Sequence, residues 1–201
     1  MRPYYVLSGV LLLAAPAAGQ TIEVTKVEFV HTRTDAATGV TSSLEEGSYQ
    51  IAPDGVYRVD RLNKATGQRS ATIEDGGRRT TLDADRREAR VEASNIIPRG
   101  TPSAWQEVGT TQRTDLGTKQ VGGLTLRGYR FTSVLAGPRG QQIVHNNEIW
   151  STVSTTPKVA PVILELRFES PAGIEEQKVV KIEKVKVSPD IFRVPRTFKT
   201  K

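Results

Sequence analysis

The sequence contains no cysteine, and this absence excludes several kinds of stabilisation and chemistry at once. No disulfide can form, no cysteine nucleophile exists, and a structural zinc site has no thiolate ligands. Processing as a lipoprotein is excluded too, because the lipid is carried by a cysteine. A chain of 201 residues must then be held together by burial and hydrogen bonding alone. This favours a continuous sheet over a small scaffold that is held together by disulfides.

Histidine is scarce, since His31 and His145 are the only two. A serine triad needs one of them beside a serine and an acid, and the sequence has no Gly-x-Ser-x-Gly elbow. On a strand, His145 shares a face with Asn147, which supplies two metal ligands at most. The sequence therefore predicts no catalytic residue, no metal and no cofactor. An enzyme, for instance a hydrolase, is the least favoured class.

No apolar run is long enough to span a bilayer. The run at residues 6–15 follows the positive charge of Arg2 and is followed by small residues. This order is typical of a secretory signal peptide, with cleavage expected between Gly19 and Gln20; an uncleaved anchor is the alternative. We therefore expect a periplasmic or secreted protein that is not a lipoprotein and has no integral membrane span after signal removal. The expected division is a signal peptide at 1–19 and a single β-rich domain at 20–201.

The net charge is +6, and about +5 once Arg2 is set aside with the signal. A basic chain can meet nucleic acid, an anionic membrane surface or acidic glycans. Export makes nucleic acid the poorest of these partners, and none is predicted. In the expected strand 86–93, one face carries Arg86, Glu88, Arg90 and Glu92. Their alternating sign favours a solvated sheet surface over a binding face for anionic headgroups.

Short apolar segments alternate with turn signals about every 8–12 residues, which is typical of antiparallel all-β proteins. The expected strands are residues 22–32, 49–51, 56–62, 69–74, 78–83, 86–93, 124–134, 141–151, 159–169 and 174–187. In the first strand the apolar parity changes between Val24 and Val27, which indicates a bulge. A helix competes for the last segment, but its many β-branched residues favour a strand. Residues 94–105 break the rhythm and are expected to form a loop with a short helical turn near Ser103.

Aromatic residues are few, with two tryptophans, five tyrosines and five phenylalanines. Core packing is the ordinary role of a side chain as large and apolar as tryptophan. The alternative is that Trp105 and Trp150 line a hydrophobic groove. The candidate groove residues are Tyr57, Val59, Trp105, Phe131 and Trp150.

The C-terminal half contains an ordered series of segments at residues 117–121, 121–128, 148–151 and 188–195. Their pattern is G…V-x-G…G, then E-x-W-x-S, then P-D-x-x-F-x-V-P. It resembles a group of uncharacterised secreted bacterial proteins that are common in acidobacteria. The layout is similar in turn to the superfamily of outer-membrane lipoprotein carriers (LolA-like), whose chains also end in a Phe-x-Val-Pro element.

The resemblance implies a mainly β fold: a strongly curved antiparallel sheet, or incomplete barrel, closed on its concave side by helices or loops. In the carriers, the cavity between sheet and lid holds acyl chains. Residues 94–112 are the only stretch here long enough to form such a lid. At the C-terminal end, Phe192 and Val194 are expected to point inward from a terminal strand or tuck that Pro195 ends.

These observations predict an exported, non-enzymatic binding protein with an apolar groove. The expected partners are a lipid, a lipoprotein or another envelope protein. The alternative is an envelope protein-interaction or stress-sensing module that uses the same sheet without a lipid ligand.

Overall fold

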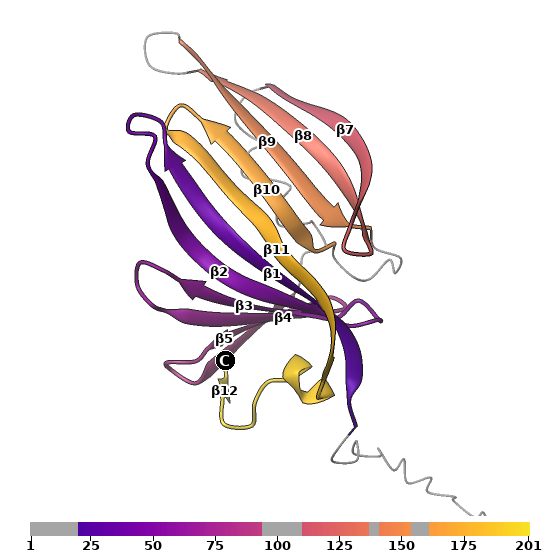
Figure 1. Ribbon diagram of the computed structural model, residues 1–201. Helices are drawn as coiled ribbons and strands as arrows, with labels where there is room; N and C mark the ends of the chain where they lie inside the picture. Colours follow the sequence, from indigo (N-terminus) through magenta and orange to yellow (C-terminus); the bar gives the residue numbers. More distant parts are fainter. Residues whose placement is uncertain (1–19, 94–109, 137–140, 154–160) are drawn as a thin grey trace, which may run out of the picture.

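The computed structural model describes residues 20–93, 110–136, 141–153 and 161–201, which form one curved sheet (Figure 1). The strands are β1 (Ile22–Asp35), β2 (Thr41–Ile51), β3 (Tyr57–Asn63), β4 (Arg69–Asp75), β5 (Arg78–Asp83), β6 (Glu88–Ala93), β7 (Thr110–Val121), β8 (Leu124–Ala136), β9 (Gln142–Thr152), β10 (Ile163–Ser170), β11 (Gly173–Val187) and β12 (Lys199–Thr200). A 3₁₀ helix, Pro189–Phe192, lies between β11 and β12. Within these ranges, no helical segment has the length and apolar character that crossing a bilayer requires.

The strand order is β12-β6-β5-β4-β3-β2-β1-β11-β10-β9-β8-β7. Consecutive strands pair antiparallel from β1 to β6 and from β7 to β11, and the β1–β11 pair joins the two runs. Figure 1 shows β3–β6 turned sharply away from β7–β10. The two ends of the order, β12 and β7, do not pair, so the sheet stays open. The predicted fold class, a curved antiparallel sheet in a mainly β protein, is confirmed.

The central pair is long and bent. β1 and β11 pair from Ile22 opposite Val187 to Asp35 opposite Gly173, with a register shift between Glu28 and Phe29. The extra residue at this shift is Val180, so the bulge lies in β11. The bulge predicted in the first strand between Val24 and Val27 is wrong, because the pairing is continuous there. A bulge bends its strand and increases the local twist, which helps the two halves of the sheet to turn away from each other.

The main core cluster joins both halves of the sheet. Its buried members are Val27, Phe29, Tyr49, Tyr57, Val59, Leu126, Val162 and Leu164. Phe29 and Tyr49 lie with their ring centroids 5.0 Å apart, and the ring of Tyr57 meets that of Tyr49 edge-on at 6.3 Å. Because the cluster takes residues from β1–β3 and from β8–β10, its burial holds the curvature of the sheet in place.

A second, smaller cluster lies under the C-terminal segment. Ala71, Ile73, Leu82 and Ala89 are buried there, and Val194 and Phe198 pack against them. This corrects the expectation for the C-terminal end. Phe192 lies in the 3₁₀ helix, which buries no residue, and the short strand of this segment comes later, as β12. Pro189 and the cap formed by Ser188 favour the helix at this point, since proline suits the first turn.

Two other strand expectations differ from the structure. β6 begins at Glu88, so Arg86 and Arg87 lie in the turn before it and not on the strand. The sequence missed β7 and the first part of β2, because most of their side chains in the described part are polar and exposed and show no apolar alternation. The expected lid segment is divided: residues 94–109 lie outside the described residues, and residues 110–112 belong to β7.

Candidate functional site

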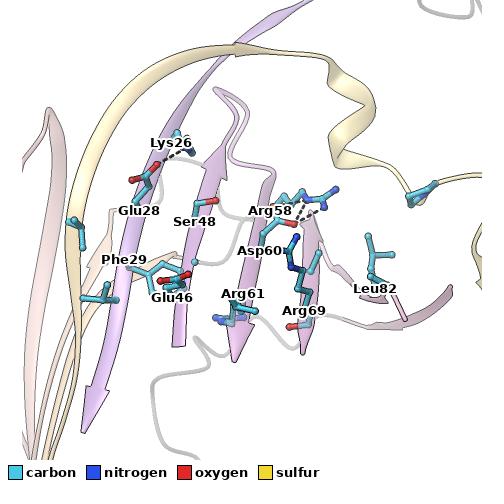
Figure 2. Close-up of a pocket in the computed structure, with 18 of the residues that line it drawn as sticks. Lys26, Glu28, Phe29, Glu46, Ser48, Arg58, Asp60, Arg61, Arg69 and Leu82 are labelled. Carbon is cyan, nitrogen blue, oxygen red and sulfur yellow. Dashed lines mark hydrogen bonds and ion pairs between the residues drawn. The ribbon is translucent and has the colours of Figure 1, made fainter. Parts of the chain in front are cut away.

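A groove of about 730 Å³ lies between the sheet and the C-terminal segment (Figure 2). Its sides are formed by β1 to β5, by Val180 of β11, and by Pro195 and Phe198 of the C-terminal segment. The lining residues come from opposite ends of the chain, because the C-terminal segment crosses from β11 to the β6 edge.

The inner part of the groove is apolar. Phe29, Leu62 and Leu82 line it from three strands, and Val180 and Phe198 line it from β11 and the C-terminal segment. Phe29 and Leu82 are nearly inaccessible, whereas Val180 is 63% exposed. An apolar lining that includes an exposed valine favours a ligand with a hydrocarbon part.

Charged residues surround this lining, and most of them are already paired. Lys26 Nζ lies 2.6 Å from Glu28 Oε1, and Lys64 Nζ lies 2.8 Å from Glu46 Oε2. The Lys26 ammonium, through its hydrogen bond and its charge, lowers the pKa of Glu28 below its usual value. Both carboxylates are therefore already occupied by a cation of the protein.

The third pair also attaches the C-terminal segment to the rim. Arg58 donates from Nε and Nη2 to the carboxylate of Asp60, at 2.9 and 2.6 Å (Figure 2). Its Nη1 donates to the backbone oxygen of Ile191 at 3.0 Å. A guanidinium that holds a carboxylate and a carbonyl together fixes the position of the 3₁₀ helix over β3.

The unpaired charge of the groove is positive. Arg69 is exposed and its side chain forms no ion pair or hydrogen bond with any described residue, while the Arg61 side chain lies 3.7 Å from Glu45. Figure 2 places both arginines at the same end of the groove. Because the rim carboxylates are occupied, this end favours a negatively charged group.

Of the residues expected to line a groove, none of the four that the structure describes lines this one. Tyr57 and Val59 line a smaller cavity of about 240 Å³, together with Pro161 and Ile163. Its polar wall is the buried ion pair between Arg79 and Glu74. Burial, followed by the charge of Glu74, raises the pKa of Tyr57 far above its usual value. Tyr57 and Val59 are both buried members of the main core cluster, so their main role is in core packing.

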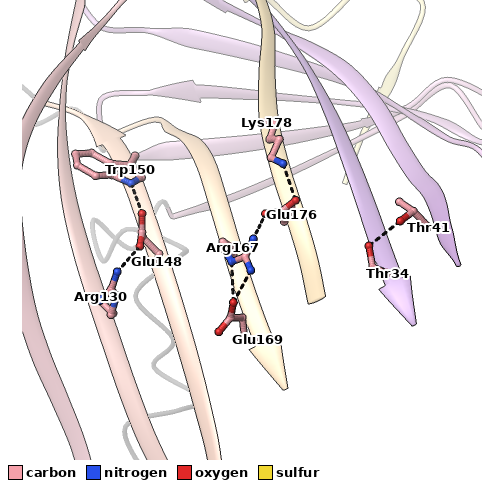
Figure 3. A network of polar contacts seen from close by, with 9 residues as sticks. All are labelled: Thr34, Thr41, Arg130, Glu148, Trp150, Arg167, Glu169, Glu176 and Lys178. Carbon is pink, nitrogen blue, oxygen red and sulfur yellow. Dashed lines mark hydrogen bonds and ion pairs between the residues drawn. The ribbon is translucent and has the colours of Figure 1, made fainter. Parts of the chain in front are cut away.

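Trp150 and Phe131 lie on the other half of the sheet. Trp150 packs against the main core cluster, with Lys119 Nζ 4.2 Å from its ring centroid. Its Nε1 donates to Glu148, the centre of a network of polar contacts on β8 and β9 (Figure 3). Phe131 is 8% exposed, 6.4 Å from the ring of Tyr129 and outside that cluster. Trp105 lies outside the described residues.

The histidines do not reach the groove. His31 Nε2 lies 3.9 Å from Glu175, and the ring of His145 packs 5.5 Å from that of Phe168. Among the described residues, no group of three or more histidine, aspartate or glutamate side chains could hold a metal ion.

Comparisons with known proteins give only distant similarity. No family model matches this chain, and no curated protein matches its sequence. Its structure is similar to that of an uncharacterized conserved protein from Thermus thermophilus, with 10% identity, 87% of this chain and 88% of that chain covered, and a TM-score of 0.45. A LolA superfamily protein from Nitrosomonas europaea is similar with 7% identity, coverage of 85% and 90%, and a TM-score of 0.41.

A third similar structure is the lipoprotein LppX of Mycobacterium tuberculosis, with 11% identity, coverage of 79% and 86%, and a TM-score of 0.33. At TM-scores of 0.45 and below, these similarities decide neither the fold nor the ligand of this chain. The function has to follow from its own side chains.

The groove residues Phe29, Leu62, Val180 and Phe198 were not singled out from the sequence. One local signal existed for Val180. Phe29 pairs with Val179 and Glu28 pairs with Lys181, so Val180 is the extra residue of the bulge in β11. Two adjacent valines in an otherwise alternating strand indicate that one of them faces away from the core.

Proposed function

We propose that this chain is an exported, non-enzymatic binding protein that holds a lipid or another amphiphile in the groove between β1–β5 and the C-terminal segment. The observation that carries the proposal is the apolar interior of this groove, which includes the exposed side chain of Val180. Its volume of about 730 Å³ lies within the range of about 300–1,000 Å³ that small-molecule sites occupy.

The distribution of charge supports an amphiphile over a purely apolar ligand. The hydrocarbon part lies against Phe29, Leu62 and Phe198, and the polar head lies toward Arg69. Because the neighbouring carboxylates are paired, a carboxylate or phosphate head is favoured over a cationic one.

Export and the absence of catalysis are parts of the same proposal. Export rests on the signal-like pattern at residues 1–19. As for catalysis, neither histidine lines the groove, so its serines, Ser48 and Ser70, have no imidazole base to activate them.

The direct test is organic extraction and mass spectrometry of the mature protein purified from a periplasm. We expect a lipid or fatty acid in stoichiometric amount. An empty protein that also fails to bind a panel of fatty acids and phospholipids would contradict the proposal.

The groove itself is tested by Val180→Arg, because a guanidinium on this wall places a charge beside the hydrocarbon part of the ligand. We expect the affinity for a fatty acid to fall at least about tenfold. Val180 is 63% exposed, so the fold should tolerate the change. Val144→Arg is the matched control, since Val144 is 46% exposed and lies outside the groove. Equal affinities of the two variants would place the ligand elsewhere.

The second candidate function, a module that binds a segment of an envelope protein, is favoured by the edge of the sheet. β7 is the last strand in the order and extends over Thr110–Val121. An edge strand of this length can accept a partner strand by β-augmentation. An empty groove together with capture of an extended peptide at β7 would support this function.

A further inference from the structure

Six basic residues gather at the β6–β12 end of the sheet. They are Arg86, Arg87 and Arg90 of the β5–β6 turn and β6, and Arg196, Lys199 and Lys201 of the C-terminal segment. We call this set the basic edge. All six residues are exposed.

The tertiary structure creates this cluster. β12 pairs in parallel with β6, with Lys199 opposite Glu88. The backbone N–H of Lys199 donates to the oxygen of Arg87, and that of Lys201 donates to the oxygen of Ala89, both at 2.9 Å. Cations separated by more than a hundred positions in the sequence therefore share one edge.

The carboxylates nearby do not neutralise the basic edge. Residues 83–93 and 196–201 contain four side-chain carboxylates: Asp83, Asp85, Glu88 and Glu92. Glu88 lies 2.7 Å from Lys201, and Asp83 lies 3.8 Å from Arg86. Six cations against four carboxylates leave these two spans with a side-chain charge of +2. The remaining four cations form no side-chain ion pair or hydrogen bond within the described ranges; they are Arg87, Arg90, Arg196 and Lys199.

Arg87 also has an unusual backbone conformation. Its φ is 51°, and it is the one non-glycine residue with a positive φ in the part of the chain that the structure describes. The left-handed region favours glycine or asparagine, so an arginine at this position is uncommon. Arg87 is the last residue of the turn before β6, and its backbone oxygen accepts the hydrogen bond from Lys199.

We propose that the basic edge docks this protein on a membrane surface that carries anionic phospholipid headgroups. A cation near such a surface strengthens binding by about fivefold. The groove lies next to this surface, because Ala84, Pro195 and Phe198 line it and flank the basic residues in the sequence. The alternating signs of the β6 face indicated a solvated surface, and the C-terminal segment changes this balance.

The test is flotation of the mature protein, residues 20–201, with vesicles of phosphatidylcholine alone or mixed with phosphatidylglycerol. We expect binding to the mixed vesicles at low salt and its loss at high salt. The triple variant Arg87→Gln, Arg90→Gln, Lys199→Gln should weaken this binding by at least about tenfold. The control Lys178→Gln, Lys181→Gln, Lys186→Gln removes the same charge from exposed positions of β11.

An equal loss in the two triple variants would show that only net charge matters and would overturn the proposal. A wild-type protein that stays unbound with mixed vesicles would overturn it too, and would leave an acidic protein as the partner of the edge. Groove occupancy is read separately, by fatty acid binding in solution. If the protein binds vesicles but no amphiphile in the groove, the proposed function is contradicted and the proposed docking surface is supported.

Discussion

At the scale of single residues, Gly47 determines how the groove meets the core. It lies opposite Phe29 in the β1–β2 pair. A Cβ at this position would lie 2.7 Å from Cζ of the Phe29 ring and would clash with the backbone oxygen of Asp60. Only glycine leaves room for this ring, which is 1% exposed and lines the groove.

Gly47→Ala should therefore destabilise the fold by about 1–3 kcal/mol, the usual cost of overpacking. The measurement is the urea midpoint of unfolding, compared with Ser43→Ala at an exposed position of the same strand. The control should stay within about 0.5 kcal/mol of the wild type. Equal midpoints for the two variants would show that Phe29 can move away freely.

Protonation of Glu148 should lower the stability of the β8–β9 pair. It accepts hydrogen bonds from Trp150 Nε1 at 2.9 Å and from Arg130 Nη2 at 3.0 Å (Figure 3). The Trp150 hydrogen bond, followed by that of Arg130, lowers the pKa of Glu148 below its usual value of 4.5. A carboxyl group with a lowered folded pKa stabilises the fold above the unfolded pKa, and this contribution is lost as the pH falls through the folded value.

Glu148→Gln should therefore reduce the loss of stability between neutral pH and about pH 3. Urea unfolding at both pH values measures this loss. Glu23→Gln serves as the control, because Glu23 is exposed and forms no ion pair within the described residues. The same pH dependence in the wild type and in Glu148→Gln would remove Glu148 from the acid-sensitive groups.

At the scale of elements, the C-terminal segment connects the core with the candidate groove. Val194 and Phe198 pack on the second core cluster, and Phe198 and Pro195 form one side of the groove. Phe192, in contrast, lies in a helix that buries none of its residues.

Phe198→Ala should destabilise the fold by about 2–3 kcal/mol, somewhat below the cost for a fully buried phenylalanine. Phe192→Ala is the matched comparison and should cost less. Deletion of residues 192–201 should cost at least as much as Phe198→Ala. Thermal or urea unfolding of the three variants tests this order, and a larger loss for Phe192 than for Phe198 would contradict it.

Some strands and turns could be predicted from the sequence and others could not. The hairpin at Asp75-Gly76-Gly77 was expected from its glycines, and both adopt a positive φ. β11 was expected as a strand from its β-branched residues, and it is one. β7 was missed, since a polar edge strand is stabilised by its ladder with β8 and not by an apolar pattern of its own.

At the scale of the whole molecule, the main core cluster connects the two halves of the sheet. Leu126 and Leu164 are fully buried, and they share the cluster with Val27 and Tyr49 from the other half. The open sheet therefore depends on this cluster to unfold as one unit.

Leu164→Ala should cost about 2–5 kcal/mol, and unfolding should remain cooperative. The check is coincidence of the urea transitions followed by far-UV circular dichroism and by tryptophan fluorescence. Val144→Ala, at an exposed position of the neighbouring strand, should change the midpoint little. Two separate transitions in the wild type would show that the halves unfold independently.

The sequence alone determined that this protein is a mainly β chain of antiparallel strands with no disulfide, while the open and strongly curved form of the sheet was expected only from the family resemblance. Alternation and turn residues are local signals, so strands and hairpins can be inferred from short windows. Only the tertiary structure shows which residues line the candidate groove. Tyr57 and Val59 face the main core cluster, and the groove takes Phe29 and Phe198 from opposite ends of the chain. A local sequence pattern does not predict which residues line the groove, because register, bulges and the path of the C-terminal segment depend on contacts between distant residues.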